Sequence, residues 1–232
     1  MKFKLLIFTL LAVIFLNSTP SFAQVVNVSS GTGFFINRLG DFVTNAHVVG
    51  KCTKIVVGQK KNVNIKAKLS VIDKEKDIAI LRTEKIPETV APLRFDTRYN
   101  IGDNVLVIGY PGNAGITRVN VMKNAKIVST KGFNNQPGWI QITNEIAKGN
   151  SGGPLLDIKG NVIGVVSGIM SKITHTGKVY EQVGVAISLP ILKKFLDSNF
   201  IQYSQRIYTE IPFFKNQVEE IANKFIYNVN CI

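Results

Sequence analysis

Short apolar runs, each closed by a turn signal, recur along most of the chain. The segment "GTGFFINRLGDFVTN" predicts a hairpin, with extended residues 33–37 and 42–45 on either side of a turn at 39–41. Similar runs follow in two series: "KIVVG", "IKAKLSVI" and "DIAILRT", then "VLVIGYPG", "NAKIVST", "WIQIT", "NVIGVVSGI" and "VGVAIS". Because no long helical pattern interrupts them, we expect an all-β chain, folded as two small antiparallel barrels or one sandwich.

A helical pattern replaces these runs near the C-terminal end. The segment "SLPILKKFLDSNF" has Pro190 at a favourable place for a helix start, and it predicts a closing helix at about 190–199. In "PFFKNQVEEIANKFIYN" the apolar residues fall on one helical face: Phe214, Val218, Ile221 and Phe225. We therefore expect residues 200–232 to form a helical extension whose apolar stripe packs against the core.

The first 23 residues have the layout of a secretory signal. Lys2 and Lys4 precede an apolar run at 5–16, and small residues stand before a cleavage point after Ala23. The run is short for a bilayer span. We therefore expect a signal peptide at 1–23, a secreted or periplasmic mature protein and no stable membrane span after cleavage. An uncleaved anchor is the alternative.

The charge of the chain is strongly basic, with 28 Lys and Arg against 15 Asp and Glu, a formal net charge of +13. Such a balance can indicate nucleic acid, an anionic membrane surface or acidic substrates as partners. The lysines are spread along the chain, however, and no nucleic-acid-binding motif accompanies them. We therefore expect a solvated basic surface and no nucleic-acid partner.

The two cysteines are Cys52 and Cys231. In an oxidising compartment such a pair can bridge, which would fasten the C-terminal end beside the segment that follows His47. Two separate thiols are the alternative, because the sequence does not supply the Cα separation that decides. No cluster of Cys and His has the spacing of metal ligands, so we expect neither a metal nor another cofactor.

Three residues with catalytic chemistry stand in the order His, Asp, Ser. His47 follows a strand in "TNAHVV", Asp77 opens the run "DIAIL", and Ser151 lies in the glycine-rich turn "GNSGGPL". A serine hydroxyl is a poor nucleophile that needs an adjacent base, and an imidazole can take its proton. A carboxylate then holds the imidazole in the required tautomer. The other histidine, His175, lies in a polar loop and is expected to be solvated.

The glycines around Ser151 fit a second task. A tetrahedral intermediate of acyl transfer places negative charge on the former carbonyl oxygen, and converging backbone N–H groups stabilise it. Gly149 can adopt the unusual backbone geometry that turns its own N–H inward. We therefore assign the oxyanion donors to the N–H groups of Gly149 and Ser151, with Asn150 as a further contributor.

The three motifs "TNAHVV", "DIAIL" and "GNSGGPL" resemble the catalytic motifs of trypsin-like serine endopeptidases. The pattern is most similar to the bacterial HtrA-type branch, because "GTGFFIN" and "GDFVTNAHVV" resemble its first strands, and "DIKGNVIGVVSG" and "GVAISLPILKKFLD" resemble its last strands and helix. The resemblance covers about residues 30–199. It implies His47 as general base, Asp77 as the residue that orients it and Ser151 as nucleophile, in a cleft between two barrels.

The resemblance also implies a domain plan. Residues 24–199 would form the protease domain, as two six-stranded antiparallel β-barrels. Barrel one would span about 24–95 and barrel two about 96–189, followed by the closing helix. The residues after Asn199 are too few for the PDZ domain that HtrA proteins usually append.

Two positions in the nucleophile turn depart from the pattern of the family. Asn150 stands where digestive trypsins carry an aspartate that pairs with a newly cut α-ammonium, so we expect no such activation switch. Lys148 stands where HtrA-type enzymes usually carry a proline beside the oxyanion glycine. The loop therefore lacks the ring that would stiffen it.

The resemblance places a specificity pocket near Glu145, six residues before the nucleophile, and Ile146. The opposite wall would be Val166, Ser167 and Gly168, followed by Ile169, and its backbone would pair with the substrate as an added strand. A carboxylate at the pocket base favours Lys or Arg at the cleaved position. The alternative is an outward Glu145 and an apolar pocket for small aliphatic residues.

The function expected from these residues is hydrolysis of peptide bonds by a serine endopeptidase, through a His-Asp-Ser triad and an acyl-enzyme. Its partners would be protein or peptide substrates. The alternative is a catalytically inert binding or chaperone-like protein on a protease scaffold. No pattern in the sequence sets an oligomeric state.

Overall fold

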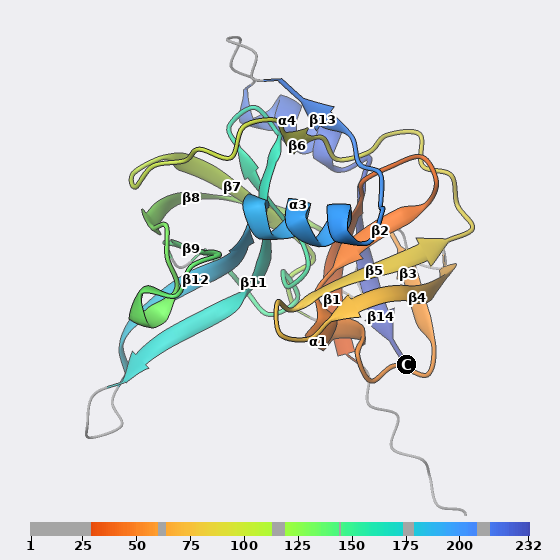
Figure 1. Ribbon diagram of the computed structural model, residues 1–232, viewed down its shortest axis with the longest axis horizontal. Helices are drawn as coiled ribbons and strands as arrows, with labels where there is room; N and C mark the ends of the chain where they lie inside the picture. Colours follow the sequence, from red (N-terminus) through yellow and green to blue (C-terminus); the bar gives the residue numbers. More distant parts are fainter. Residues whose placement is uncertain (1–28, 60–63, 113–118, 144, 174–178, 208–213) are drawn as a thin grey trace, which may run out of the picture.

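The computed structural model describes residues 29–59, 64–112, 119–143, 145–173, 179–207 and 214–232. They form two closed β-barrels that lie side by side, together with three α-helices, one of which crosses the middle of the view in Figure 1. The prediction of two six-stranded antiparallel barrels is thereby confirmed. The expected signal peptide lies outside the described residues. Within the described part, no helix has both the length and the apolar character needed to cross a membrane.

Barrel one has five strands from the first half of the chain and one from its end. In the order in which they pair around the barrel, the strands are β1 (Ser29–Phe35), β14 (Ile226–Cys231), β3 (Ile55–Gly58), β4 (Ile65–Asp73), β5 (Ile78–Thr83) and β2 (Asp41–Thr44). The predicted hairpin is present as β1 and β2. Alternate inward side chains fill this barrel because strand residues point to opposite faces in turn.

Strand β14 corrects the expectation of an entirely helical extension over 200–232. The extension does contain a helix, α4 (Lys215–Ala222), but Ile226–Cys231 are extended and pair with β1 and β3. Val218 of α4 is buried as the helical stripe predicts, whereas Phe214 is exposed. Phe225 is buried too, but it lies in the turn after α4. Tertiary pairing overrode the helical spacing, because a strand at this place satisfies the hydrogen bonds of two barrel edges at once.

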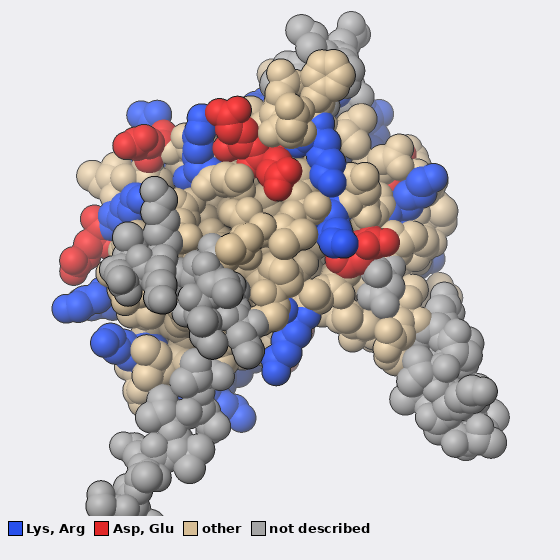
Figure 2. Space-filling view, turned by 180° about the vertical axis from the view of Figure 1, so that it is seen from behind, with Lys and Arg blue, Asp and Glu red and all other residues tan. Residues whose placement is uncertain are grey.

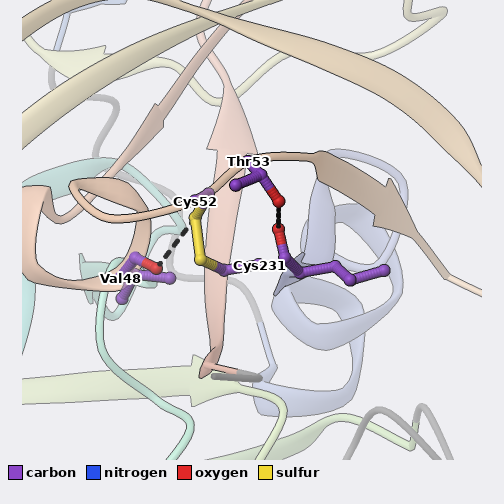
Figure 3. Close-up of a disulfide and its surroundings, with 5 residues drawn as sticks. Val48, Cys52, Thr53 and Cys231 are labelled. Carbon is purple, nitrogen blue, oxygen red and sulfur yellow. Dashed lines mark hydrogen bonds between the residues drawn. A yellow bond between two sulfur atoms is a disulfide. The ribbon is translucent and has the colours of Figure 1, made fainter. Parts of the chain in front are cut away.

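A disulfide fastens β14 to the loop after α1 (Ala46–Val49). Figure 3 shows Cys52 joined to Cys231. Their Cα atoms are 5.1 Å apart, and their sequence separation is 179. The neighbouring Thr53 hydroxyl donates to the Ile232 carbonyl at 2.6 Å. The Val48 carbonyl oxygen lies 3.7 Å from the Cys52 sulfur. The end of β14 is therefore held next to the short helix that carries His47.

Barrel two is built from consecutive strands of the second half of the chain. In the order in which they pair, its strands are β10 (Pro154–Asp157), β7 (Asn104–Gly109), β8 (Val121–Ser129), β9 (Trp139–Ile142), β12 (Val179–Ser188) and β11 (Val162–Ile173). The pairing of β10 with β11 closes the barrel. Two short parallel strands, β6 (Leu93–Arg94) and β13 (Gln205–Arg206), extend the sheet at β11.

The core runs through both barrels and under the predicted closing helix. That helix is α3 (Leu189–Ser198), which buries Leu192, Phe195 and Leu196 at helical spacing. The largest apolar cluster contains residues of both barrels, α3 and α4, and each barrel also has a cluster of its own. The loops between the barrels are therefore fixed on a shared core. A 3-10 turn, η1 (Phe133–Asn135), completes the elements.

Candidate active site

His47 and Asp77 meet at one end of barrel one. His47 lies on α1, which follows β2, and Asp77 ends the turn between β4 and β5. The Nδ1 atom of His47 lies 2.8 Å from Oδ2 and 2.9 Å from Oδ1 of Asp77. Because a carboxylate only accepts hydrogen bonds, Nδ1 is the donor in this contact, and in the neutral imidazole Nε2 then carries the lone pair. The geometry therefore leaves a free basic nitrogen on an imidazole whose side chain is 51% exposed.

The Asp77 carboxylate is held by several donors. The His47 backbone N–H donates to Oδ1 at 3.0 Å, and the Ser167 hydroxyl donates to Oδ2 at 2.7 Å. Asp77 has a φ of 56°, a left-handed conformation that Asp tolerates better than most residues. Burial raises the pKa of Asp77, but the hydrogen bonds from His47 and Ser167 outweigh it, so the pKa lies below its ordinary value of 3.8. The carboxyl is therefore ionised at neutral pH.

Ser151 comes from barrel two, in the turn between β9 and β10. Its hydroxyl donates to the carbonyl of Ser167 at 2.9 Å. Ser167 thus contacts both groups, with its carbonyl on Ser151 and its hydroxyl on Asp77. Sequence reasoning had placed Ser167 only in the wall of the specificity pocket and missed this connection. A small hydroxyl residue directly after the buried run "NVIGVV" is the signal that could have indicated it.

The glycines of the turn are required by close backbone contacts. Gly149 has a φ of 99° and Gly152 a φ of 86°, both in the left-handed region. A Cβ atom on Gly149 would lie 2.3 Å from the Tyr110 carbonyl oxygen, and one on Gly152 would lie 2.2 Å from the Thr32 carbonyl oxygen. Any side chain at either position would displace the backbone of a neighbouring strand or loop. The turn around Ser151 is therefore fixed by its packing.

The N–H groups predicted to bind an oxyanion are those of Gly149 and Ser151. The Lys148 carbonyl accepts from the Gly112 N–H at 2.7 Å, and in a trans peptide the following N–H points in the opposite direction. Within the described residues, neither the Gly149 nor the Ser151 N–H donates to a backbone carbonyl, whereas that of Asn150 donates to Ala147 at 3.0 Å. Two donors thus remain available, and the Asn150 N–H is already used.

Thr32 is a buried residue of β1 that sequence reasoning did not select. Its hydroxyl donates to the Gly149 carbonyl at 2.7 Å and accepts from the Tyr110 N–H at 2.9 Å. Its backbone N–H also donates to the Ser151 carbonyl at 2.8 Å. Thr32 is fully buried and belongs to barrel one, while the turn that it holds belongs to barrel two. It therefore fixes the Ser151 turn against the barrel that carries His47.

The two residues predicted at the pocket base face different surroundings. Glu145 is exposed, whereas Ile146 is 7% exposed and belongs to the apolar cluster of barrel two. Ile146 packs closely on Gly184 of β12, where an added Cβ would lie 2.6 Å from the Ile146 Cδ1 atom. The position six residues before Ser151 thus does not supply a buried carboxylate.

In the predicted pocket wall, Val166 is not available to pair with a substrate strand. The Val166 N–H donates to the Gly153 carbonyl at 2.8 Å, and its carbonyl accepts from the Gly152 N–H at 2.7 Å. Both backbone groups of Val166 are therefore used by the Ser151 turn and cannot pair with an added strand. Beyond it, the described part of β11 pairs only with β12, so Gly168 and the 43% exposed Ile169 lie at an open edge.

His175 lies outside the described residues. Among the described residues, no group of His, Cys, Asp and Glu has the arrangement of a metal site. Among the described residues, hydrogen bonds join His47 to Asp77, Ser167 to Asp77 and Ser151 to Ser167, and none joins His47 directly to Ser151.

Comparison with known proteins gives a matching family and several similar proteins. A family model described as a trypsin-like peptidase domain matches residues 31–165. An uncharacterized protein of Sinorhizobium fredii is 35% identical over 183 residues, which are 77% of this chain and 29% of the relative. A probable periplasmic serine endoprotease, DegP-like, of Bartonella henselae is 31% identical over 180 residues, which are 75% of this chain and 35% of the relative.

A solved structure of an HtrA-type protease, AlgW, with a decapeptide is similar in fold. Its TM-score is 0.61 at 25% sequence identity, and the match covers 73% of this chain and 51% of that chain. The present chain spans about a third of the length of the two curated relatives.

Proposed function

Because the chain belongs to the family of trypsin-like peptidases, we propose that it is a secreted or periplasmic serine endopeptidase with His47, Asp77 and Ser151 as its triad. The observation that carries the proposal is the series of hydrogen bonds from His47 to Asp77, from Ser167 to Asp77, and from Ser151 to Ser167. These bonds join a base and an acid of barrel one to a nucleophile of barrel two.

The reaction begins when the Ser151 hydroxyl leaves the Ser167 carbonyl. A substrate strand that pairs with the open edge of β11 offers that carbonyl an N–H, which replaces the hydroxyl. The hydroxyl then turns toward Nε2 of His47, gives up its proton there, and its oxygen attacks the substrate carbonyl carbon. His47 returns the proton to the leaving amine as the peptide bond breaks. An ester on Ser151 remains.

Water completes the cycle. It gives a proton to His47, attacks the ester and releases the acid product, and the proton returns to Ser151. The negative oxygen of each tetrahedral intermediate accepts hydrogen bonds from the N–H groups of Gly149 and Ser151. The bond between the Lys148 carbonyl and Gly112 supports this role, because it turns the Gly149 N–H away from the protein's interior acceptors. Asp77 stays ionised throughout.

The residue preferred at the cleaved position is a small aliphatic one. Its side chain would lie over Ile146 and Gly184, which fill the base of the region with apolar atoms. The exposed Glu145 removes the support for a basic preference, because its carboxylate meets water rather than a buried cation. Ile146→Ala is expected to admit larger residues at this position, and Glu145→Ala is expected to leave the preference unchanged.

The partners of the protein are proteins or peptides. A decapeptide accompanies the related HtrA-type protease. On the face shown in Figure 2, Lys and Arg side chains are dispersed among uncharged and acidic residues and form no single basic surface. This distribution gives no support to a nucleic-acid ligand. The disulfide between Cys52 and Cys231 and the names of the DegP-like relatives both support an oxidising, extracytoplasmic location.

Cleavage of a randomised peptide library tests the proposal. Wild-type protein and Ser151→Ala are each incubated with the library, and the new termini are identified by mass spectrometry. The expected result is cleavage after small aliphatic residues by wild type, and none by the variant. An inert binding protein would give no new termini with either. If wild type instead cleaves after Lys and Arg, and Glu145→Ala does not, then Glu145 forms a pocket that prefers basic residues.

A further inference from the structure

A hollow of about 400 Å³ lies beside His47, on the side of barrel one. It is lined by Ala46, His47, Gly50, Lys51, Lys74 and Asp77. One wall is the turn that follows α1, and the other is the turn between β4 and β5 that ends in the triad acid. The hollow therefore lies directly beside His47 and Asp77, and no step of the proposed hydrolysis uses Lys51 or Lys74.

The charge of this hollow is positive. Lys51 and Lys74 are both exposed, and within the described residues neither forms an ion pair with a carboxylate. The acid in the lining, Asp77, is already held by His47 and Ser167. The ammonium groups of Lys51 and Lys74 thus line a small open space, and the carboxylate that also lines it, Asp77, is paired with His47 and with neither lysine.

The acids near Lys74 in sequence are engaged elsewhere. The Asp73 carboxylate is paired with the ammonium of Lys76, and hydrogen bonds from Lys76 lower the pKa of Asp73. Glu75 lines a different hollow, beside Trp139 and Ile191. Neither side chain lines the space beside His47, so among the described lining residues the one acid is Asp77, which His47 and Ser167 already hold.

The geometry of a bound substrate decides which of its residues reaches the hollow. A strand added to the open edge of β11 sends successive side chains to opposite faces. The side chain at the cleaved position, P1, lies over Ile146 and Gly184 of barrel two. The residue before it, P2, must then point the other way, toward barrel one, where His47 and the hollow lie.

We propose that the hollow between Lys51 and Lys74 is a subsite for an acidic side chain, and that the enzyme prefers Asp or Glu at P2. This inference rests on the proposed function and narrows its substrate class to peptides with an acid directly before a small aliphatic residue. An ion pair at an exposed site changes an equilibrium constant by a few-fold, so two lysines together should raise kcat/KM by about 10-fold.

The test uses four peptides that share the P1 residue found in the library. They carry Glu, Ala or Lys at P2, and the fourth carries Ala at P2 with the Glu moved to P4. Wild type should cleave the P2-Glu peptide about 10-fold faster, in kcat/KM, than the P2-Ala peptide. The peptide with Glu at P4 has the same net charge, so it separates a subsite from general attraction to a basic protein.

Charge reversal in the protein gives the second arm. The double variant Lys51→Glu/Lys74→Glu should prefer the P2-Lys peptide, a gain that an unfolded protein cannot show. Lys51→Arg/Lys74→Arg should keep the acid preference, because it keeps the charge. The matched control is Lys68→Glu, an exposed lysine of β4 that does not line the hollow, and it should keep the wild-type ratio.

The outcomes separate the two proposals. Equal cleavage of the P2-Glu and P2-Ala peptides by wild type would overturn the subsite and leave the protease intact. Equal kcat/KM for the P4-Glu and P2-Glu peptides would also overturn the subsite, because general attraction of an acidic peptide to a basic protein would then explain the preference. If wild type cleaves none of the four peptides, the endopeptidase itself is rejected and the subsite with it.

Discussion

The two barrels are closed in different ways. Barrel two closes through β10, a strand that pairs with its sequence neighbour β11 and with β7. Barrel one closes through β14, which comes from the end of the chain and enters between β1 and β3. The nucleophile thus lies on a barrel made of consecutive strands, and the base lies on a barrel that needs the C-terminal segment. The acid–base half of the site is therefore the half that depends on the chain being intact and oxidised.

Removing β14 should have the largest effect of the changes considered, because it should unfold barrel one and leave barrel two folded. Deletion of residues 226–232 leaves the backbone groups of β1 and β3 unpaired and takes the buried Tyr227 and Val229 from the core of barrel one. We expect barrel one to lose its protection against amide hydrogen exchange. A synthetic peptide of residues 226–232, added in trans, should restore it as a donated strand. Full protection of β1 and β3 without the peptide would contradict the dependence on β14.

Loss of the disulfide should have the next largest effect. Cys52→Ala/Cys231→Ala removes a link that closes a very long loop, and the free energy of unfolding should fall by about 2–5 kcal/mol. Chemical denaturation of the variant and of wild type, with and without dithiothreitol, measures this change. Reduced wild type should match the variant. If the disulfide of wild type is shown to be reduced and the free energy of unfolding does not change, barrel one does not depend on the disulfide.

The contact between the barrels can be weakened at Thr32. Thr32→Val removes the hydroxyl that serves Gly149 and Tyr110, and it leaves two buried backbone groups without a partner. The expected cost is about 2–3 kcal/mol in the free energy of unfolding. Thr32→Ser restores the hydroxyl and should recover the peptidase rate as well as most of the stability. A rate for Thr32→Val equal to wild type would show that the Ser151 turn holds its shape without barrel one.

The smallest effect concerns the pH dependence of Asp77. Its pKa lies below 3.8, so the stability that it contributes is complete above that pH and is lost as the pH falls through the folded-state value. Ser167→Ala removes one donor, so the pKa of Asp77 should rise and acid unfolding should begin at a higher pH. At neutral pH the cost should be about 1 kcal/mol.

Acid titrations followed by circular dichroism measure the effect of Ser167→Ala. Ser171→Ala, at an exposed serine of the same strand, is the matched control and should unfold at the wild-type pH. Ser167→Thr keeps a hydroxyl, so its acid midpoint of unfolding should lie between those of Ser167→Ala and Ser171→Ala. Identical acid midpoints for Ser167→Ala and Ser171→Ala would mean that Ser167 does not stabilise the ionised form of Asp77.

The sequence predicts the local features of this molecule well. The hairpin of β1 and β2, the short strands and the helix α3 follow from apolar spacing and turn residues, which act over a few positions. The order of His47, Asp77 and Ser151 could be read because each residue stands in its own motif. The features that could not be predicted depend on distant partners.

Strand β14 shows why such features escape a reading of the sequence. The segment "FIYNVNC" begins in the helical stripe and then alternates apolar and polar residues over five positions, "YNVNC", a short strand signal that the helical reading passed over. Its strand partners, β1 and β3, lie far away in sequence. Ser167 and Thr32 raise the same difficulty, because each acts through hydrogen bonds to residues far away in sequence. The exposure of Glu145 likewise depends on how Ile146 packs against Gly184, which spacing from Ser151 does not reveal.

Labelling with a fluorophosphonate tests most directly whether the two barrels together form one nucleophilic site. Attack by Ser151 on phosphorus releases fluoride and leaves a phosphonyl group on the serine, which mass spectrometry of the peptide locates. We predict one group per chain, on Ser151, in oxidised wild type, and a rate at least 100-fold lower in His47→Ala. Folded, oxidised wild type without an adduct on Ser151, or equal rates in wild type and His47→Ala, would contradict the account.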